Sequence, residues 1–411
     1  MNYCITNDNC AATKNNIVLK VRDNIPHLIK YMGSKKELID SVVDAISENY
    51  HGETICDLFA GSSILSGAIG TIASIHSNDI QEYSAVFART YLGDYTWKEF
   101  NGIIENTVEI AQKHVNKMYD KFPKYVDNYG KNISLSDFTI IEKEQQSLIR
   151  KDFKKINYFL FTKYYSGTYW SFDQCAWIDG LRLAADMYKD TTVFFPILSS
   201  LMYAMAYNSQ STGHYAQYRD AYDEKSMNDI LSYRLRGIKE FYVKKLIELI
   251  QFTGKNKRKH TITSLDYRDC LNIIKPQTIV YADPPYVFVH YSRFYHALET
   301  LVKYDYPDVL FKGRYRSDRH QSPFCRKTEV VSAFNDLFEG IAEKESKLVL
   351  SYSDTGMIKL DQIIEIAKAK FGSSYSINKK EIPHKHSTMG RFDDKNRHVT
   401  EYLITFNPSA L

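Results

Sequence analysis

The chain has 411 residues, of which 44% are hydrophobic and 25% are charged, and its net charge at pH 7 is +4. This composition is typical of a globular protein with a large buried core, and it excludes a disordered or fibrous chain. The length suggests two domains. So small a net charge does not by itself indicate nucleic-acid binding, which would need local clusters of basic residues.

The cysteine pattern favours a reducing compartment. The sequence contains six cysteines: Cys4, Cys10, Cys56, Cys175, Cys270 and Cys325. None forms a Cys-x-x-Cys pair and no histidine spacing completes a zinc pattern, so we predict free thiols and no metal site. The N-terminus lacks a signal-peptide pattern, and the apolar stretch 193–207 is too short to span a membrane. We therefore predict a cytoplasmic protein in which residues 193–207 form a buried helix.

The N-terminal part of the chain alternates between strand and helix patterns. Residues 1–27 are polar and without periodicity, which predicts a flexible arm. The apolar spacing that follows predicts these elements: a helix over 35–46, a strand over 54–59, a helix over 64–72, a strand over 74–79 and a helix over 83–91. This alternation is typical of a parallel sheet covered by helices.

Residues 97–265 interrupt the alternation, and we predict that they form an inserted, mainly helical domain. From residue 266 the alternation returns. The expected elements there are strands over 278–283 and 347–353, helices over 327–345 and 355–371, and a closing strand pair over 374–383 and 399–407. The predicted fold class is therefore α/β, with a catalytic domain formed by residues 28–96 and 266–411.

The segment Asp283-Pro284-Pro285-Tyr286 directly follows a β-branched strand. Asp283 can accept one N–H of an exocyclic amine and the Pro284 carbonyl can accept the other, which makes the nitrogen more nucleophilic. The prolines stiffen the loop, and Tyr286 can stack on a planar base. The alternative is an ordinary turn at the end of a strand, because Asp and Pro both favour turns.

Two more strand ends carry candidate ligand contacts. Gly61 follows the strand over 54–59, where a glycine lets the backbone approach a ligand closely. Asp79 ends the next strand, where an acid can accept ribose hydroxyls, although it could instead cap the following helix. The loop over 30–36 precedes a helix and could equally be a solvated basic loop. The glycine segment has neither the dinucleotide pattern nor the phosphate-loop pattern.

Taken in order, these segments resemble the motifs of the N6-adenine DNA methyltransferases that use S-adenosylmethionine. The similar segments are Lys-Tyr-Met-Gly-Ser-Lys (30–35), Asp-Leu-Phe-Ala-Gly-Ser (57–62), Asn-Asp-Ile (78–80) and Asp-Pro-Pro-Tyr (283–286). The order resembles the group whose recognition domain is inserted before the catalytic motif. This resemblance implies a Rossmann-like methyltransferase sheet, mostly parallel with a closing antiparallel strand, and covers residues 28–95 and 260–410.

The resemblance also implies the residues that hold S-adenosylmethionine. Tyr31 would lie near the cofactor adenine, and Lys35 would be a further cofactor contact. Asp57 would face the ammonium group of the methionine part, Gly61 would leave room for it, and Asp79 would hold the ribose. No metal is implied, because the methyl group is already activated in this cofactor.

The catalytic motif would act on a base extruded from double-stranded DNA. By the resemblance, Asp283 would bind the target amine beside the cofactor with the help of Pro284, and Tyr286 would stack on the flipped adenine.

The inserted domain and the basic segments supply the expected DNA contacts. Polar side chains over 208–214 can reach base edges, whereas the basic stretches 255–260 and 312–316 suit phosphates. The alternative for the basic run 255–260 is a solvated surface loop. The predicted DNA-binding residues are Asn208, Gln210, His214, Lys257, Arg258, Arg314 and Arg316.

We therefore predict a site-specific DNA adenine methyltransferase of a restriction-modification system or a phage. A cognate endonuclease acting on the same site, without a stable complex, is the partner that such a system implies, and no membrane contact is expected. One alternative is a methyltransferase on cytosine N4, against which Asp283 argues, because those enzymes more often carry Ser there. Another is a catalytically silent DNA-binding subunit, against which the intact Asp57, Asp79 and Asp283 argue.

Overall fold

The computed structural model describes residues 17–30, 38–210, 214–286, 288, 290–386 and 397–409. Its main sheet has the strand order β3-β2-β1-β4-β7-β9-β8. These strands are β1 (Ile55–Asp57), β2 (Ile75–Asn78), β3 (Thr261–Thr263), β4 (Ile279–Ala282), β7 (Lys347–Ser353), β8 (Tyr375–His386) and β9 (Arg397–Pro408). Neighbours from β3 to β7 are parallel, and β9 is antiparallel to both β7 and β8. The expected mostly parallel sheet with a closing antiparallel strand is confirmed.

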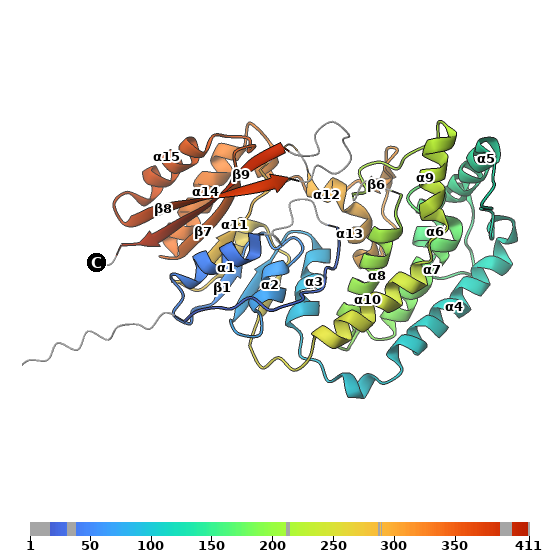
Figure 1. Cartoon of the computed structure of the whole chain (residues 1–411), viewed down its shortest axis with the longest axis horizontal. Coiled ribbons are helices and arrows are strands. Elements are labelled where there is room, and N and C mark those ends of the chain that lie inside the picture. Colours follow the sequence, from blue (N-terminus) through green and yellow to red (C-terminus); the bar gives the residue numbers. More distant parts are fainter. Residues whose placement is uncertain are drawn as a thin grey trace, which may run out of the picture.

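Two helical layers cover the sheet (Figure 1). One layer contains α1 (Ile39–Ser47), α2 (Ile64–Ile69) and α3 (Glu82–Leu92), and the other contains α11 (Tyr267–Ile273), α14 (Val330–Glu343) and α15 (Leu360–Phe371). Side chains alternate between the layers along each strand. Ile55 and Ile279 belong to the core on the side of α1, whereas Cys56 and Val280 belong to the core on the side of α14. Strands buried on both faces explain the nearly continuous apolar runs in the sequence.

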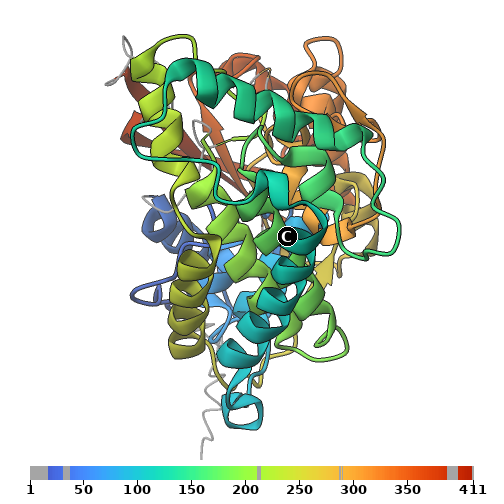
Figure 2. The ribbon, with the colours of Figure 1, turned by 90° about the vertical axis from the view of Figure 1, so that its right-hand side faces the viewer.

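The helices between α3 and β3 form the second half of the molecule, on the right in Figure 1 and nearest to the viewer in Figure 2. They are α4 (Ile103–Lys121), α5 (Leu135–Gln146), α6 (Leu160–Tyr165), α7 (Phe172–Asp186), α8 (Phe194–Asn208), α9 (Glu224–Arg234) and α10 (Ile238–Phe252). They do not pack as an isolated body, because Phe87 of α3 and Leu198 of α8 belong to one continuous core. The buried helix expected over 193–207 is α8, with Pro196 in its first turn.

The chain returns to the sheet earlier than we expected. The inserted segment was predicted to extend to residue 265, but β3 already pairs with β2 at Thr261–Thr263. A strand of three residues, of which the first is exposed, has too little periodicity to be recognised in the sequence. Four short elements after β4 were also not predicted: α12 (Tyr291–Phe294), α13 (His296–Lys303), β5 (Val309–Leu310) and β6 (Tyr315–Arg316).

No helix in the described part of the chain combines the length and the apolar character needed to cross a membrane. The most apolar helix, α8, has 15 residues, and most of its side chains are buried in the core that it shares with α3.

A buried ion pair joins two of the inserted helices. Arg234 of α9 donates from Nε to Oε1 of Glu142 in α5 at 2.9 Å and from Nη2 to Oε2 at 2.7 Å. Arg234 also donates to the Thr168 carbonyl at 2.6 Å, and the Tyr129 hydroxyl donates to Glu142. Both side chains of the pair are removed from water. A buried pair of this kind strongly penalises the loss of either charge, because the remaining charge stays in a medium of low dielectric constant.

We expect Glu142→Gln to lower the free energy of unfolding by about 3–5 kcal/mol, because it leaves the buried guanidinium of Arg234 without a compensating charge. Denaturant unfolding followed by circular dichroism measures this loss. The matched control is Glu109→Gln, which breaks the fully exposed pair with Lys113 on α4 and should leave the unfolding midpoint unchanged. Equal effects of the two substitutions would contradict a structural role for the buried pair.

Candidate functional site

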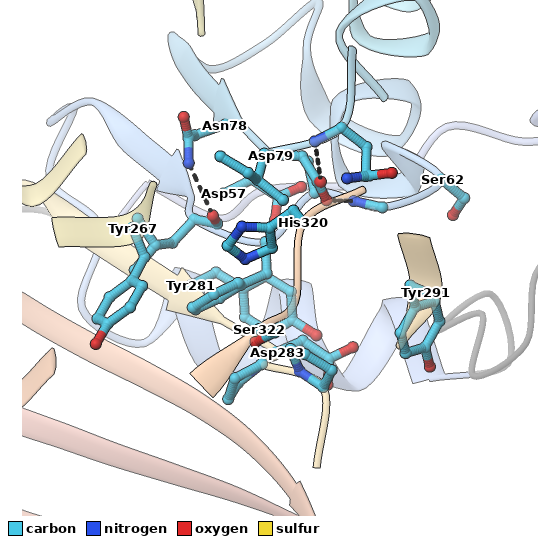
Figure 3. Close-up of a pocket in the computed structure, with 18 of the residues that line it drawn as sticks. Asp57, Ser62, Asn78, Asp79, Tyr267, Tyr281, Asp283, Tyr291, His320 and Ser322 are labelled. Atoms are coloured by element: carbon cyan, nitrogen blue, oxygen red, sulfur yellow. Dashed lines mark hydrogen bonds between the residues drawn. The ribbon is translucent and has the colours of Figure 1, made fainter. Parts of the chain in front are cut away.

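The carboxyl ends of β1, β2 and β4 open into one cavity, in which about 1140 Å³ is free of protein atoms when the adjoining open solvent is included. Because these strands are parallel neighbours, the residues that end or follow them meet at the same edge of the sheet. Asp57, Asp79 and Asp283 therefore line the same cavity, as Figure 3 shows. The predicted residues Gly61, Pro284 and Tyr286 also line it. Of the predicted cofactor contacts, Tyr31 and Lys35 lie outside the described residues.

The loop after β1 holds its shape through backbone hydrogen bonds to both neighbouring strands. The Leu58 N–H donates to the Tyr281 carbonyl and the Ala60 N–H donates to the Asn78 carbonyl, each at 2.9 Å. Gly61 has a φ of +50°, in the left-handed region that a side chain disfavours. This conformation directs the Gly61 N–H to Oδ2 of Asp79 at 2.9 Å, so the glycine loop and the acid form one unit.

Two backbone N–H groups orient the carboxylate of Asp79. Besides the bond from Gly61, its Oδ1 accepts the Gln81 N–H at 2.9 Å. The N-cap position of α3 is Gln81 and not Asp79, so the alternative that Asp79 is the N-cap residue does not apply. Burial raises the pKa of Asp79 to about 6, although the two N–H bonds act in the opposite direction.

Asn78, the first residue of the Asn-Asp-Ile segment, links three strand ends. Its Nδ2 donates to the carbonyls of Leu58 at 3.2 Å and Leu265 at 3.1 Å. Its Oδ1 accepts from Thr263 Oγ1 at 2.7 Å and from the Leu265 N–H at 3.1 Å. Asn78 is buried and therefore positions the loops after β1 and β3 on either side of β2.

Asp57 is buried beside the other two acids. Burial, followed by the nearby carboxylates of Asp283 and Asp79, raises the pKa of Asp57 well above its usual range. The floor of the cavity therefore gathers carboxyl groups whose ionised form is disfavoured by burial, and a bound cation would favour that ionised form.

The Asp283–Tyr286 loop is anchored by the far strands of the sheet. The Tyr286 hydroxyl donates to Oε1 of Glu401 in β9 at 3.1 Å, and the Met357 N–H donates to the Tyr286 carbonyl at 2.9 Å. The ring of Tyr286 also meets that of Tyr352 in β7 edge to face, with 5.7 Å between centroids. The position of this ring in the cavity wall is thus held by β7 and β9.

Several cavity residues were missed by sequence reasoning. They are Leu265, Asp266, Tyr267, Tyr291, Ser292 and Ser322. Asp266 lies shortly after β3, while Asp57 ends β1 and Asp79 directly follows β2, and this recurrence of an acid near a strand end was the available signal. The residues after α12 and β6 carry no comparable signal, because only the tertiary structure brings those segments to the cavity.

Two predicted base-reading residues are enclosed in the protein. Gln210 is fully buried, and its Nε2 donates to the carbonyls of Thr168 at 2.7 Å and Arg219 at 3.0 Å. Asn208 is also fully buried, and its Nδ2 donates to the Ala204 carbonyl one helical turn earlier at 2.7 Å. Their amides stabilise the end of α8 and the chain around it, so we no longer assign these two residues to base recognition.

The predicted phosphate contacts at β6 are likewise internal. Arg316 is buried and binds Asp305 and Asp318 through paired bonds of 2.6–3.0 Å. Arg314 donates to the carbonyls of Tyr164 and Gln146, and burial lowers its pKa. These arginines fasten the segment after the catalytic loop to α6 and to its own neighbours. We therefore withdraw both residues as DNA contacts.

The remaining predicted DNA contacts fall at different places. His214 lies against α12, where its ring stacks on Phe294 with 4.2 Å between centroids. Burial lowers the pKa of His214, followed by the effect of Arg293. Lys257 and Arg258 are exposed on the loop that leads into β3. Because that loop meets the start of β3, it lies at the edge of the sheet opposite to the cavity, as expected for the alternative of a solvated loop.

Sheet pairing creates one group of side chains that could hold a metal ion. The Sγ atoms of Cys56 and Cys270 lie 3.9 Å apart, and the Nε2 atom of His76 lies 3.9 Å from Cys270 Sγ. Linear spacing could not reveal this group, because Cys56 and His76 meet across β1 and β2. The donor set suits Zn²⁺. None of its members lines the cavity, however, and His76 Nε2 also bonds Thr263 Oγ1 at 2.9 Å, so we derive no step from it.

Comparison with known proteins gives consistent matches. A family model described as D12 class N6 adenine-specific DNA methyltransferase matches residues 31–365. Similar relatives include modification methylase LlaI of Lactococcus lactis subsp. lactis, with 22% identity over 83% of this chain and 48% of the relative. Modification methylase StsI of Streptococcus sanguinis has 22% identity over 92% and 51%, and the type II methyltransferase M.FokI of Planomicrobium okeanokoites has 25% over 83% and 47%. The chain thus spans about half the length of these relatives.

We expect Asp57→Asn to change how stability depends on pH. The pKa of Asp57 is raised in the folded protein, so its contribution to stability is lost as pH rises from the unfolded pKa of about 3.9 toward the folded one. The Asp57→Asn variant lacks this penalty. The melting temperature of the variant minus that of the wild type should therefore increase by roughly 2 °C or more between pH 5 and pH 8. Differential scanning calorimetry measures the gain. Asp44→Asn, on the exposed side of α1, is the control, and a pH-independent difference for Asp57→Asn would refute the interpretation.

Proposed function

Because this chain belongs to the D12 class N6 adenine-specific DNA methyltransferase family, we propose that it transfers a methyl group from S-adenosylmethionine to N6 of an adenine flipped out of double-stranded DNA. The observation that carries this proposal is the single cavity shared by the acids of β1 and β2 and the Asp283–Tyr286 loop. Such a cavity can hold a cofactor and a target amine side by side, which is the positioning that catalysis by proximity requires.

We assign the acids of β1 and β2 to the cofactor. The raised pKa of Asp57 supports this role, because the ammonium group of a ligand would stabilise the ionised carboxylate. A carboxylate has about four acceptor sites, and Asp79 uses two of them for Gly61 and Gln81, which leaves two for a ribose diol. S-adenosylmethionine supplies an already activated methyl group when bound, so the proposed reaction requires no metal ion. Tyr31 and Lys35 are assigned to the cofactor from the resemblance alone.

We assign the target amine to Asp283 and to the Pro284 carbonyl. Both groups accept hydrogen bonds, and together they can hold the two N–H groups of an exocyclic amine and make its lone pair available. Asp283 acts here as a hydrogen-bond acceptor more than as a strong base. Tyr286 is assigned to stack on the flipped base, and its bond to Glu401 supports this role because it keeps the ring in place without any substrate.

The inserted helices α4–α10 are the proposed recognition domain, as in the family group that the motif order resembles. The chain between α8 and α9 supports this assignment. Within it, His214 stacks on Phe294 of α12, and the Tyr215 N–H donates to the Phe294 carbonyl at 2.7 Å. Since Tyr291 of the same helix lines the cavity, this part of the insertion adjoins the place where the base must enter.

The biological role that we propose is modification in a restriction-modification system or a phage. The names of the relatives, modification methylases LlaI and StsI and type II methyltransferase M.FokI, support this role. A cognate endonuclease would then recognise the same DNA site without forming a stable complex. The proposed place of action is the cytoplasm of the bacterial or phage-infected cell, where the DNA substrate lies.

Expression of the protein in cells that lack DNA methylation, followed by single-molecule sequencing, tests the proposed reaction directly. We expect N6-methyladenine at one position of one short sequence motif. Cytosine N4 modification would instead support the alternative amine, and unmodified DNA together with tight DNA binding would support a silent subunit.

We expect Asp283→Ala to reduce methyl transfer at least about 100-fold, because the target amine loses its fixed hydrogen-bond acceptor. Transfer of a radiolabelled methyl group to DNA measures the loss. Calorimetric binding of S-adenosylhomocysteine should remain largely intact, which separates this effect from a defect in folding. Retained transfer activity in this variant would rule out the assignment.

Cofactor binding should weaken as pH falls through about 6. Below that value Asp79 is protonated in the ligand-free protein, and it must lose its proton to accept both ribose hydroxyls. Titration of S-adenosylhomocysteine between pH 5 and pH 8 should show affinity falling by up to about tenfold per pH unit on the acid side. Asp79→Asn should bind weakly at pH 8 and lose the part of the dependence centred near pH 6. An unchanged profile in that variant would contradict the role of Asp79.

A further inference from the structure

Two arginines share one aromatic ring beside the cavity. The guanidinium carbon of Arg319, in the segment after β6, lies 5.2 Å from the centroid of the Tyr315 ring, and that of Arg293 in α12 lies 5.6 Å from it. Tyr315 is buried, and the rings of Phe311 and His296 lie 5.3 and 5.8 Å from it. The ring is therefore fixed, and it holds both cations near one point by cation–π attraction.

Neither of these arginines is neutralised by an acid. Within the described residues no ion pair involves Arg293 or Arg319, and Nε of Arg293 and Nη1 of Arg319 are buried without a hydrogen-bond acceptor. Other shielded arginines do have acidic partners: Arg316 has Asp305 and Asp318, and Arg234 has Glu142, although Nη1 of Arg234 also lacks an acceptor. Leaving a buried charged donor without an acceptor costs free energy. An anion bound from outside the protein would remove this cost for both arginines.

The groups around the pair are also basic. Burial lowers the pKa of His290, and the positive charges of Arg319, Arg326, His320 and Arg293 lower it further. Positive charge thus gathers beside the cavity wall that His290 and His320 form, whereas the three acids lie at the cavity floor.

Several of these groups belong to the cavity itself. His290 and His320 line its wall, and Asp266 is the acid that acts on His320 there. His290 follows Tyr286 by only four residues, and its Nδ1 is buried without a hydrogen-bond partner among the described residues. This positive charge therefore lies within reach of the base bound at Asp283 and Tyr286.

We propose that Arg293 and Arg319 clamp one phosphodiester that flanks the flipped adenine. This inference rests on the proposed function, because the anion it names belongs to the DNA substrate. Guanidinium groups match the oxygens of a phosphate with parallel N–H donors, and their binding to the cavity rim fixes the backbone about which the base must rotate. Phosphate contacts position the duplex without reading its sequence, so both arginines are positioning residues.

Substitution of single phosphates by neutral methylphosphonates tests the clamp. Short duplexes carry the target motif, identified by single-molecule sequencing, with one methylphosphonate at each position in turn, and DNA affinity is measured with S-adenosylhomocysteine present. We expect the wild type to lose about 10- to 100-fold affinity at one phosphate next to the target adenine. Arg293→Gln and Arg319→Gln should lose a similar factor on unmodified DNA and show no further loss at that phosphate.

The matched control is Arg89→Gln, which removes an exposed arginine near the end of α3, the helix that leads away from the cavity. It should keep the wild-type methylphosphonate profile. Arg293→Lys and Arg319→Lys retain the charge but not the fork of donors, so they should recover only part of the affinity. Unchanged affinity for S-adenosylhomocysteine and an unchanged melting temperature would separate the clamp from a purely structural role.

Each outcome decides the proposal. If Arg293→Gln and Arg319→Gln lose as much DNA affinity as the wild type at every methylphosphonate position, the proposal is overturned. It is also overturned if no single phosphate dominates the affinity loss of the wild type. If a glutamine variant unfolds, the lysine variants decide the question. The clamp is overturned if a methylphosphonate at the flanking position reduces the DNA affinity of both lysine variants as much as it reduces that of the wild type. Failure of the wild type to methylate the unmodified duplex would instead refute the proposed function.

Discussion

The parallel alignment of β1, β2 and β4 is the constraint on which the site depends. Parallel neighbours end at the same edge of a sheet, so three acids that are far apart in the sequence, Asp57, Asp79 and Asp283, line one cavity. Their burial raises the pKa of Asp57 and Asp79, which means that the folded chain keeps carboxylates under electrostatic strain. Such strain is tolerable where a cationic ligand relieves it. As pH rises, the stability of the ligand-free protein should therefore fall while its affinity for the ligand increases.

The rest of the fold holds this edge in position. Asn78 ties the loops after β1 and β3 to β2, and Gly61 completes the link to Asp79 through a backbone conformation that favours glycine. On the other side, Glu401 of the antiparallel strand β9 holds the hydroxyl of Tyr286. The closing strand thus contributes directly to the cavity wall as well as to the sheet.

Charge is distributed unevenly around the cavity, and this separation accounts for the two kinds of ligand that we propose. The floor carries acids that suit a cation, whereas Arg293 and Arg319, next in sequence to the lining residues Ser292 and His320, have no acidic partner among the described residues. The inserted helices reach this side of the cavity through the stacking of His214 on Phe294, and they share a continuous core with α3. A base entering the cavity would therefore meet fixed groups on every side.

The sequence by itself determined the strands of the sheet other than β3, the order of the motifs and the acids at the ends of β1, β2 and β4, because strand periodicity and turn chemistry are local. Only the tertiary structure decided whether the other polar residues face a ligand or bind other parts of the protein. Gln210 and Arg316 look like DNA contacts in the sequence, yet each has internal partners, whereas Arg319 forms no ion pair within the described residues. The Cys56, His76 and Cys270 group was equally hidden. Whether a polar side chain faces a ligand or the protein depends on partners distant in the chain, and local patterns carry no information about them.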